Sequence, residues 1–101
     1  MNDLDICKRI AEIEGLKISR EIPVCVINPE SSIQYFKEKV YNPLTDDGLC
    51  FRLIEKYRVS INWENKTVWI GSHYIEWDKN TDIDTVKKAA CVIIIEANKD
   101  K

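Results

Sequence analysis

The chain has 101 residues, of which 45% are hydrophobic and 32% are charged, a composition typical of globular proteins. This length supports one modest core, so we expect a single domain over residues 1–101, with 98–101 as a frayed tail. Because 15 basic and 17 acidic residues leave a net charge of −2, no strong field attracts DNA or RNA, and we expect no dedicated nucleic-acid binding.

Residues 3–14 have the pattern of an amphipathic helix. Apolar side chains recur at helical spacing while charged side chains hold the opposite face. The apolar positions are Leu4, Ile6, Cys7, Ile10, Ala11 and Ile13. Asn2 or Asp3 can cap the start, and Gly15 suits the left-handed residue that ends many helices. We therefore predict a first helix that ends at Gly15.

The segment 17–40 carries weaker signals. Its apolar run 24–27 follows Pro23, a residue that cannot donate to a β-ladder and is tolerated at the start of a strand. We expect a short edge strand or an extended segment in the first half of 17–40. Residues 31–40 fit a short helical turn and an ordered loop equally well.

The stretch 40–57, VYNPLTDDGLCFRLIEKY, places turn-forming residues ahead of a helical apolar stripe. Pro43 stiffens the approach, and side chains from Thr45 to Asp47 can satisfy the free amides of a first turn. We expect Gly48 to keep side-chain bulk out of that turn. A second helix is predicted to begin near 45–47 and to end near Tyr57.

Residues 58–80 alternate apolar and polar side chains, which predicts a three-stranded antiparallel meander. If Asn65 and Lys66 form a two-residue turn, Ile61 pairs with Ile70 and Asn62 with Trp69. One face then holds Val59, Ile61, Trp63, Val68, Ile70, Ile75 and Trp77. The other face holds Ser60, Asn62, Thr67, Trp69, Tyr74 and Glu76.

The final segment predicts a closing helix. Thr81 and Asp84 have the spacing of a weak capping box, and an apolar stripe follows. Its members are Ile83, Val86, Ala90, Ile93 and Ala97. Because residues 89–95 are apolar almost all round, we expect this helix to be covered on both sides, by the rest of the domain or by a second subunit. We therefore expect a homo-oligomer.

Together these elements predict an α+β fold, in which an antiparallel sheet of three or four strands is packed by three helices in the order α(β)αβββα. The four cysteines lie far apart, and His73 is the only histidine. We therefore expect no metal site, no cofactor and no catalytic set. Because no apolar run matches a membrane span or a secretory signal, we expect a cytosolic protein that binds no membrane.

The tryptophan on the polar face is the most informative aromatic residue. Trp69 and Tyr74, close to hydrogen-bonding side chains, suit stacking on a planar ring whose edges are read by polar groups. The alternative, of equal weight, is that a helix or a subunit covers this face and Trp69 belongs to the core.

The charged candidates have structural alternatives as well. Asp46 and Asp47 resemble a metal or general-acid pair, but carboxylates in a first turn more often cap amides. Arg52 and Arg58 flank the second helix, and a guanidinium suits phosphate, although solvated surface arginine is the commoner role.

The stretch 41–53, YNPLTDDGLCFRL, resembles a motif of small proteins encoded by tailed phages and prophages. In that motif an aromatic residue precedes Asn-Pro-Leu-x-Asp-Asp-Gly-x-x-x-Arg-Leu. The stretch is also similar to the phage α-β-α sandwich domain, which has a Pro-x-Thr-Asp step before its central helix. The resemblance covers the whole chain in outline. Within the motif this chain differs from the family at two positions, because Leu49 and Cys50 stand where the family usually has Asp-Ala.

The resemblance implies a phage accessory protein without catalysis that counteracts host defence in the host cytosol. Some proteins with similar sandwich folds sequester nucleotide signals within an oligomer, so a nucleotide-type ligand is expected. The residues of the expected ligand site are Trp69, Tyr74, Tyr41, Asn42, Thr45, Asp46, Arg52 and Arg58. In this hypothesis the aromatic rings stack on a base, the arginines meet phosphate, and the polar side chains contact ribose or base edges.

Two other hypotheses come from different classes of protein. One is a protein–protein inhibitor of a host defence complex, similar to an anti-CRISPR protein, whose partner is a host defence protein. The other, less favoured, is a metal-dependent nucleotide-processing enzyme that uses Asp46 and Asp47.

Overall fold

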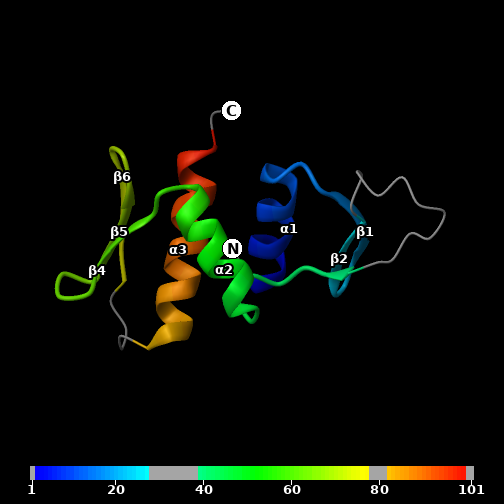
Figure 1. The fold of residues 1–101 in the computed structure, drawn as a ribbon, viewed down its shortest axis with the longest axis horizontal. Helices are drawn as coiled ribbons and strands as arrows, with labels where there is room; N and C mark the ends of the chain where they lie inside the picture. Colours follow the sequence, from blue (N-terminus) through cyan, green and yellow to red (C-terminus); the bar gives the residue numbers. More distant parts are fainter. Residues whose placement is uncertain (1, 28–38, 78–81, 100–101) are drawn as a thin grey trace. The chain divides into compact units, whose positions relative to one another are not determined.

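The computed structural model describes residues 2–27, 39–77 and 82–99, and these form three helices and two antiparallel sheets (Figure 1). The elements in chain order are α1 (Asp3–Ile13), β1 (Lys17–Glu21), β2 (Val24–Ile27), β3 (Lys39–Val40), α2 (Asp47–Lys56), β4 (Ser60–Asn62), β5 (Thr67–Ile70), β6 (His73–Glu76) and α3 (Ile83–Ala97). The predicted α+β class is confirmed, with the strands divided between two three-stranded sheets. The chain forms two compact units, unit 1 over Met1–Asn42 and unit 2 over Pro43–Lys101.

In unit 1 the first helix is confirmed at both ends. The Asn2 side chain accepts a hydrogen bond from the Asp5 amide at 2.8 Å, so Asn2 is the N-cap. Gly15 adopts a φ of 72°, and the amide of Leu16 donates to the carbonyl of Ala11 at 3.0 Å. This bond is the one that closes a helix with a left-handed residue.

The first sheet is richer than the sequence predicts. β2 follows Pro23 as expected, but it is the central strand between β1 and β3 and not an edge strand. Val24, Cys25 and Val26 are buried, and α1 packs against β1 and β2. The structure has two strands where the sequence predicts one strand or extended segment, because four of the five residues of β1 are exposed and leave no apolar pattern. Of residues 31–40, predicted as a helical turn or an ordered loop, 31–38 lie outside the described residues, whereas Lys39 and Val40 form the strand β3.

In unit 2, α2 begins where the sequence predicts. Asp46 is its N-cap, and the Asp46 Oδ1 atom accepts a hydrogen bond from the Leu49 amide at 3.1 Å. The expectation for Gly48 is wrong: a Cβ added there would meet its nearest atom, Asp46 Oδ1, at 3.6 Å, an ordinary contact. The helix ends at Lys56 with Tyr57 as its C-cap, close to the predicted end, and Arg58 follows with a φ of 56°.

The second sheet confirms the predicted faces but not the predicted register. Ile61 pairs with Val68 and Asn62 with Thr67, so residues 63–66 form the turn instead of 65–66 alone. Part of the reason is that Asn62 Oδ1 accepts a hydrogen bond from the Asn65 amide at 3.0 Å, which stabilises the longer turn. Because the register differs by two residues, every side chain within the three strands keeps its predicted face. Trp63, predicted on the apolar face, lies instead in the turn and is 52% exposed.

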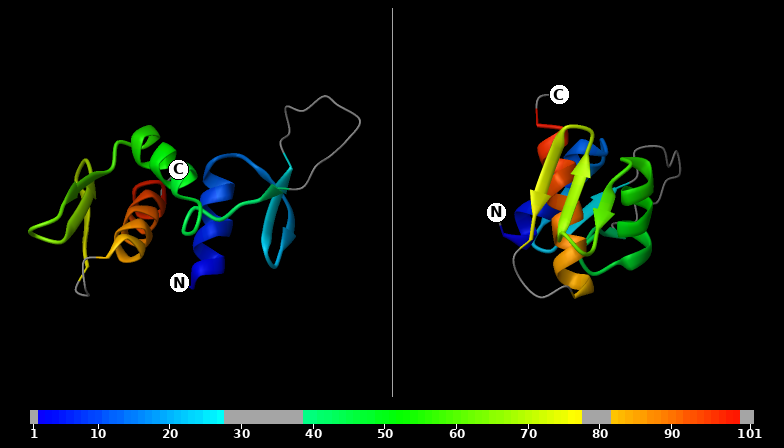
Figure 2. Two further views of the ribbon diagram at one scale, coloured as in Figure 1. Left: turned by 60° about the horizontal axis from the view of Figure 1, so that its bottom comes forward. Right: turned by 90° about the vertical axis from the view of Figure 1, so that its left-hand side faces the viewer.

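The apolar face of this sheet packs on α3 (Figure 2). Val68, at the centre of the sheet, is 0% exposed. α3 begins after Asp82, whose side chain accepts a hydrogen bond from the Thr85 amide at 2.7 Å. The predicted capping residue Thr81 lies outside the described residues.

The closing helix is buried along most of its length, as its composition predicts. The buried members of the apolar run are Ala89, Ala90, Cys91, Ile93, Ile94 and Ile95. Ile83, placed by the sequence on the buried stripe, is instead 51% exposed. Self-association through this helix stays a prediction. The frayed tail falls partly on residues 100–101, outside the described residues.

Candidate functional site

The second sheet presents two aromatic side chains side by side on the face opposite α3. Trp69 of β5 pairs directly with Tyr74 of β6, and Ser60 of β4 pairs with Trp69 on its other side. Directly paired residues of an antiparallel sheet have Cβ atoms about 5 Å apart, so the two rings are neighbours. They form a small aromatic platform, which we call the Trp69–Tyr74 face.

Exposure shows whether this chain itself covers Trp69. The residue is 37% exposed and Tyr74 is 69% exposed, whereas Val68, on the other face, is 0% exposed. Trp69 is therefore not part of the core of this chain. Indole and phenol rings held open to solvent on a sheet can stack on a planar ligand.

The next row of the same face is polar. Asn62 pairs with Thr67, and Thr67 pairs with Glu76. Thr67 and Asn62 are already engaged in the turn, because the Thr67 hydroxyl donates to the Asn65 carbonyl at 3.0 Å and Asn62 Oδ1 accepts from the Asn65 amide. The exposed Glu76 carboxylate lies beside them and is an acceptor suited to hydroxyl or amino groups.

The two predicted arginines differ in their distance along the chain from this face. Arg58 is exposed and lies two residues before Ser60, the first residue of β4, which pairs with Trp69. Arg52 is exposed on α2. Arg58 is thus the arginine nearest in sequence to the aromatic platform.

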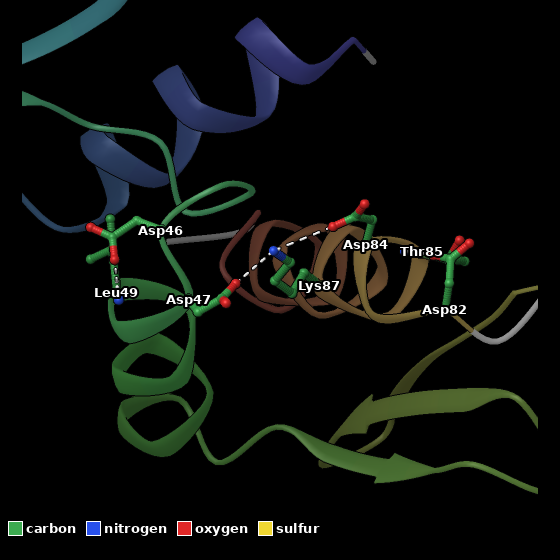
Figure 3. A network of polar contacts seen from close by, with 7 residues as sticks. All are labelled: Asp46, Asp47, Leu49, Asp82, Asp84, Thr85 and Lys87. Carbon is green, nitrogen blue, oxygen red and sulfur yellow. Dashed lines mark hydrogen bonds and ion pairs between the residues drawn. The ribbon is translucent and has the colours of Figure 1, made fainter.

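The neighbouring carboxylates Asp46 and Asp47 have separate partners (Figure 3). Asp46 caps its own helix, whereas Asp47 Oδ1 lies 2.7 Å from Lys87 Nζ on α3. Lys87 also lies 3.4 Å from Asp84 Oδ1. The hydrogen bond from Lys87 to Asp47, with the charges of both aspartates, raises the pKa of Lys87 although its partial burial opposes this. Since a protonated lysine occupies Asp47, the pair is poorly suited to hold a shared cation.

Tyr41 and Asn42 belong to unit 1, apart from the other six predicted residues. Tyr41 is only 6% exposed, and the Asn42 Oδ1 atom accepts a hydrogen bond from the Cys7 thiol at 3.3 Å. Both line a cavity of about 280 Å³ in unit 1, together with Asp3, Leu4 and Val40. The sequence did not predict this cavity, because it depends on how α1 and the first sheet pack. Among the described residues that line it there is no lysine or arginine, so those residues offer a phosphate group no cationic partner.

Thr45 is exposed in the turn before α2 and precedes the capping residue Asp46. Asp46 uses its carboxylate as a cap, which is the structural role that the sequence favoured. The motif at 41–53 therefore contributes mainly to the start of α2 and to the cores of both units, with Tyr41 buried in unit 1 and Leu53 in unit 2.

The four cysteines are buried and not joined in disulfides. In unit 2, a hydrogen bond from Cys91 and the nearby charge of Lys87 lower the pKa of the Cys50 thiol, although burial opposes this shift. Among the described residues, no three His, Cys, Asp or Glu side chains gather as a metal site would require. Within the same residues, no helix combines the length and the apolar character that a bilayer crossing demands.

Comparison with models of protein families, with curated proteins and with solved structures gives no match to this chain. The candidate site is therefore defined by its own geometry.

Proposed function

We propose that the chain is a binding protein without catalysis, which takes up a nucleotide-type small molecule on the Trp69–Tyr74 face. The observation that carries the proposal is the directly paired and exposed aromatic side chains of β5 and β6, on an otherwise polar face. Stacking of a base on an aromatic side chain contributes about 1–3 kcal/mol. Glu76 supports the assignment because a carboxylate can accept hydrogen bonds from ribose hydroxyls or an exocyclic amino group.

In this proposal the phosphate group is bound by Arg58. Its side chain is exposed, and it comes just before the strand whose Ser60 lies beside Trp69. A guanidinium binds phosphate through two parallel hydrogen bonds, which a lysine cannot do. Arg52, on α2, is the second candidate for this contact.

The biological role that we propose is the sequestration of a nucleotide signal of host defence, in the host cytosol, by a phage accessory protein. The support for the phage origin is the motif at 41–53, and the support for the ligand class is the aromatic face. A homo-oligomer would let one assembly hold several ligands.

The proposal is tested with purified full-length chain and a panel of cyclic dinucleotides, cyclic trinucleotides and cyclic ADP-ribose isomers. We expect a ligand of this panel to raise the unfolding temperature and to be retained by the protein. Trp69→Ala should abolish both effects. Trp63→Ala, which removes another exposed tryptophan of unit 2, should leave them unchanged.

Two outcomes would contradict the proposal. If no member of the panel shifts the unfolding temperature or is retained, and a stoichiometric host protein is captured from lysate, the chain is a protein inhibitor. If the nucleotide recovered after denaturation in Mg²⁺ or Mn²⁺ has been converted, the chain is an enzyme.

A further inference from the structure

We propose that unit 2 carries a second binding site, an apolar cavity that takes one bulky apolar side chain from a basic peptide segment of a partner protein. The site is independent of the Trp69–Tyr74 face. It is lined by residues of α2, of α3 and of the start of the second sheet, and we call it the Ile83 cavity after a residue of its wall.

The Ile83 cavity has a volume of about 60 Å³, and its walls include Ile54, Ile61 and Val86. A cavity needs roughly 10–15 Å³ of such space to hold one water molecule, so this one has room for a few heavy atoms. That is the size of a side-chain tip and not of a nucleotide. Because the walls are apolar, a buried water would find few partners there, and an apolar group is the better occupant.

Three large apolar residues from three segments line the cavity and remain open to solvent. Phe51 of α2 is 60% exposed, Trp63 is 52% exposed, and Ile83 at the start of α3 is 51% exposed. Scattered surface apolar residues need no explanation, but several around one cavity mark an interaction site. Tryptophan and phenylalanine are also frequent anchors at protein interfaces.

The charges bound to one wall residue of the cavity, Lys87, select the kind of partner. Lys87 lines the cavity, but its side chain is only 9% exposed and its amine is engaged by Asp47 and Asp84. The side chains of Asp47 and Asp84 are 68% and 85% exposed. A partner therefore meets two accessible carboxylates and one mostly buried lysine side chain. Figure 3 shows the Lys87 amine between the two aspartates. This arrangement attracts lysine or arginine beside the anchor and repels acidic residues.

The proposal is tested by selection from a library of short peptides with a fixed central leucine and randomised flanks, using the full-length chain as bait. We expect lysine and arginine to be enriched next to the leucine, and the selected peptide to bind with a dissociation constant below about 1 mM. Enrichment of acidic flanks, or no binding at that concentration, would overturn the proposal.

Two variants locate the binding. Ile83→Ser should raise the dissociation constant of the selected peptide by about tenfold or more, which corresponds to about 1.4 kcal/mol. Ile22→Ser is the matched control, because Ile22 is 76% exposed in unit 1 and should have no effect. Asp84→Asn should weaken binding and reduce its dependence on salt concentration. Equal affinity of the wild type and the Ile83→Ser variant would overturn the site assignment, provided that circular dichroism shows both to be folded.

Discussion

Gly48 occupies the second position of α2 without a steric reason for being glycine. Its φ is not left-handed, and an added Cβ would make only an ordinary contact. Because glycine has more conformational freedom to lose on folding than alanine, Gly48→Ala should stabilise the protein by about 0.5–1 kcal/mol. Urea unfolding would measure this gain. A loss of stability would show that the motif glycine has a structural role after all.

Arg58 is the opposite case, a bulky residue in a conformation that favours glycine. It follows α2 with a φ of 56°, and the next amide, that of Val59, donates to the Ile54 carbonyl at 3.0 Å, the bond that usually accompanies a glycine at this place. Arg58→Gly should therefore raise stability by about 0.5–1 kcal/mol, as measured by thermal unfolding.

Arg52→Gly is the matched control for this prediction. It makes the same chemical change inside α2, where glycine costs about 1 kcal/mol, so its effect should have the opposite sign. Equal effects of the two changes on stability would contradict the claim that Arg58 occupies a conformation that favours glycine. If Arg58 binds phosphate, Arg58→Gly should also weaken ligand binding, and this loss could not be attributed to a weaker fold.

The N-cap of α3, Asp82, makes the stability of the protein depend on pH. Hydrogen bonds from Thr85 lower the pKa of Asp82 below its ordinary value of 3.8. A carboxylate with a lowered pKa contributes stability above its unfolded pKa and loses that contribution as the pH falls through the folded pKa. The protein should therefore lose stability as the pH drops below about 3.8.

Asp82→Asn separates the cap from its titration. Asparagine caps a helix as well as aspartate does but carries no proton to gain. This variant should show a smaller stability difference between neutral and acidic pH, whereas Asp82→Ala should lose stability already at neutral pH. Chemical unfolding over a pH series checks both. An unchanged acid dependence in Asp82→Asn would refute the role of this carboxylate.

Helices were easier to predict from the sequence than strands, for a physical reason. α1, α2 and α3 each bury one stripe and carry a side-chain cap, both of which are local signals. The short strands β1 and β3 have mostly exposed side chains, so their sequences lack the alternation of apolar and polar residues that predicts a strand. Both form by pairing with β2. The turn was predicted as residues 65–66 but spans 63–66. A hydrogen bond from the Asn65 amide to the Asn62 side chain stabilises the longer turn, and the alternating pattern does not reveal this bond.

The candidate site was predictable in part. The alternation of apolar and polar residues was enough to place Trp69 and Tyr74 on the polar face. Side chains alternate between the two faces of a sheet, so a register error of two residues leaves each of them on the correct face. Their exposure was not predictable, since it depends on what covers the sheet. Tyr41 was predicted to stack on a ligand, but it is buried in unit 1. The prediction failed because a single aromatic residue outside a periodic pattern carries no sequence signal of whether it is buried.

The two compact units allow a test of the single-domain prediction. Unit 1, over Met1–Asn42, is near the lower size limit of about 40 residues for a fold without disulfides or metals. We therefore predict that both units unfold in one transition. All three tryptophans, Trp63, Trp69 and Trp77, belong to unit 2, so their fluorescence reports that unit alone.

Ile10→Ala in unit 1 should lower the unfolding midpoint seen by tryptophan fluorescence. Ile10 and Ile93 are each 0% exposed, and removing such a side chain costs about 2–5 kcal/mol. Ile93→Ala, in unit 2, should lower the same midpoint. If Ile10→Ala left the fluorescence transition unchanged while circular dichroism showed an earlier one, the units would be separate domains.

The central claim is that the Trp69–Tyr74 face binds a planar, nucleotide-type ligand, and the indole N–H signals in a ¹⁵N NMR titration test it most directly. The three tryptophans differ in a useful way: Trp69 lies on the proposed face, Trp63 is exposed elsewhere, and Trp77 is 7% exposed. On titration with the nucleotide that stabilises the protein most, the Trp69 signal should move in a saturable way while the Trp77 signal stays in place. Movement of the Trp63 signal alone, or saturable binding that leaves the Trp69 signal unmoved, would contradict the claim.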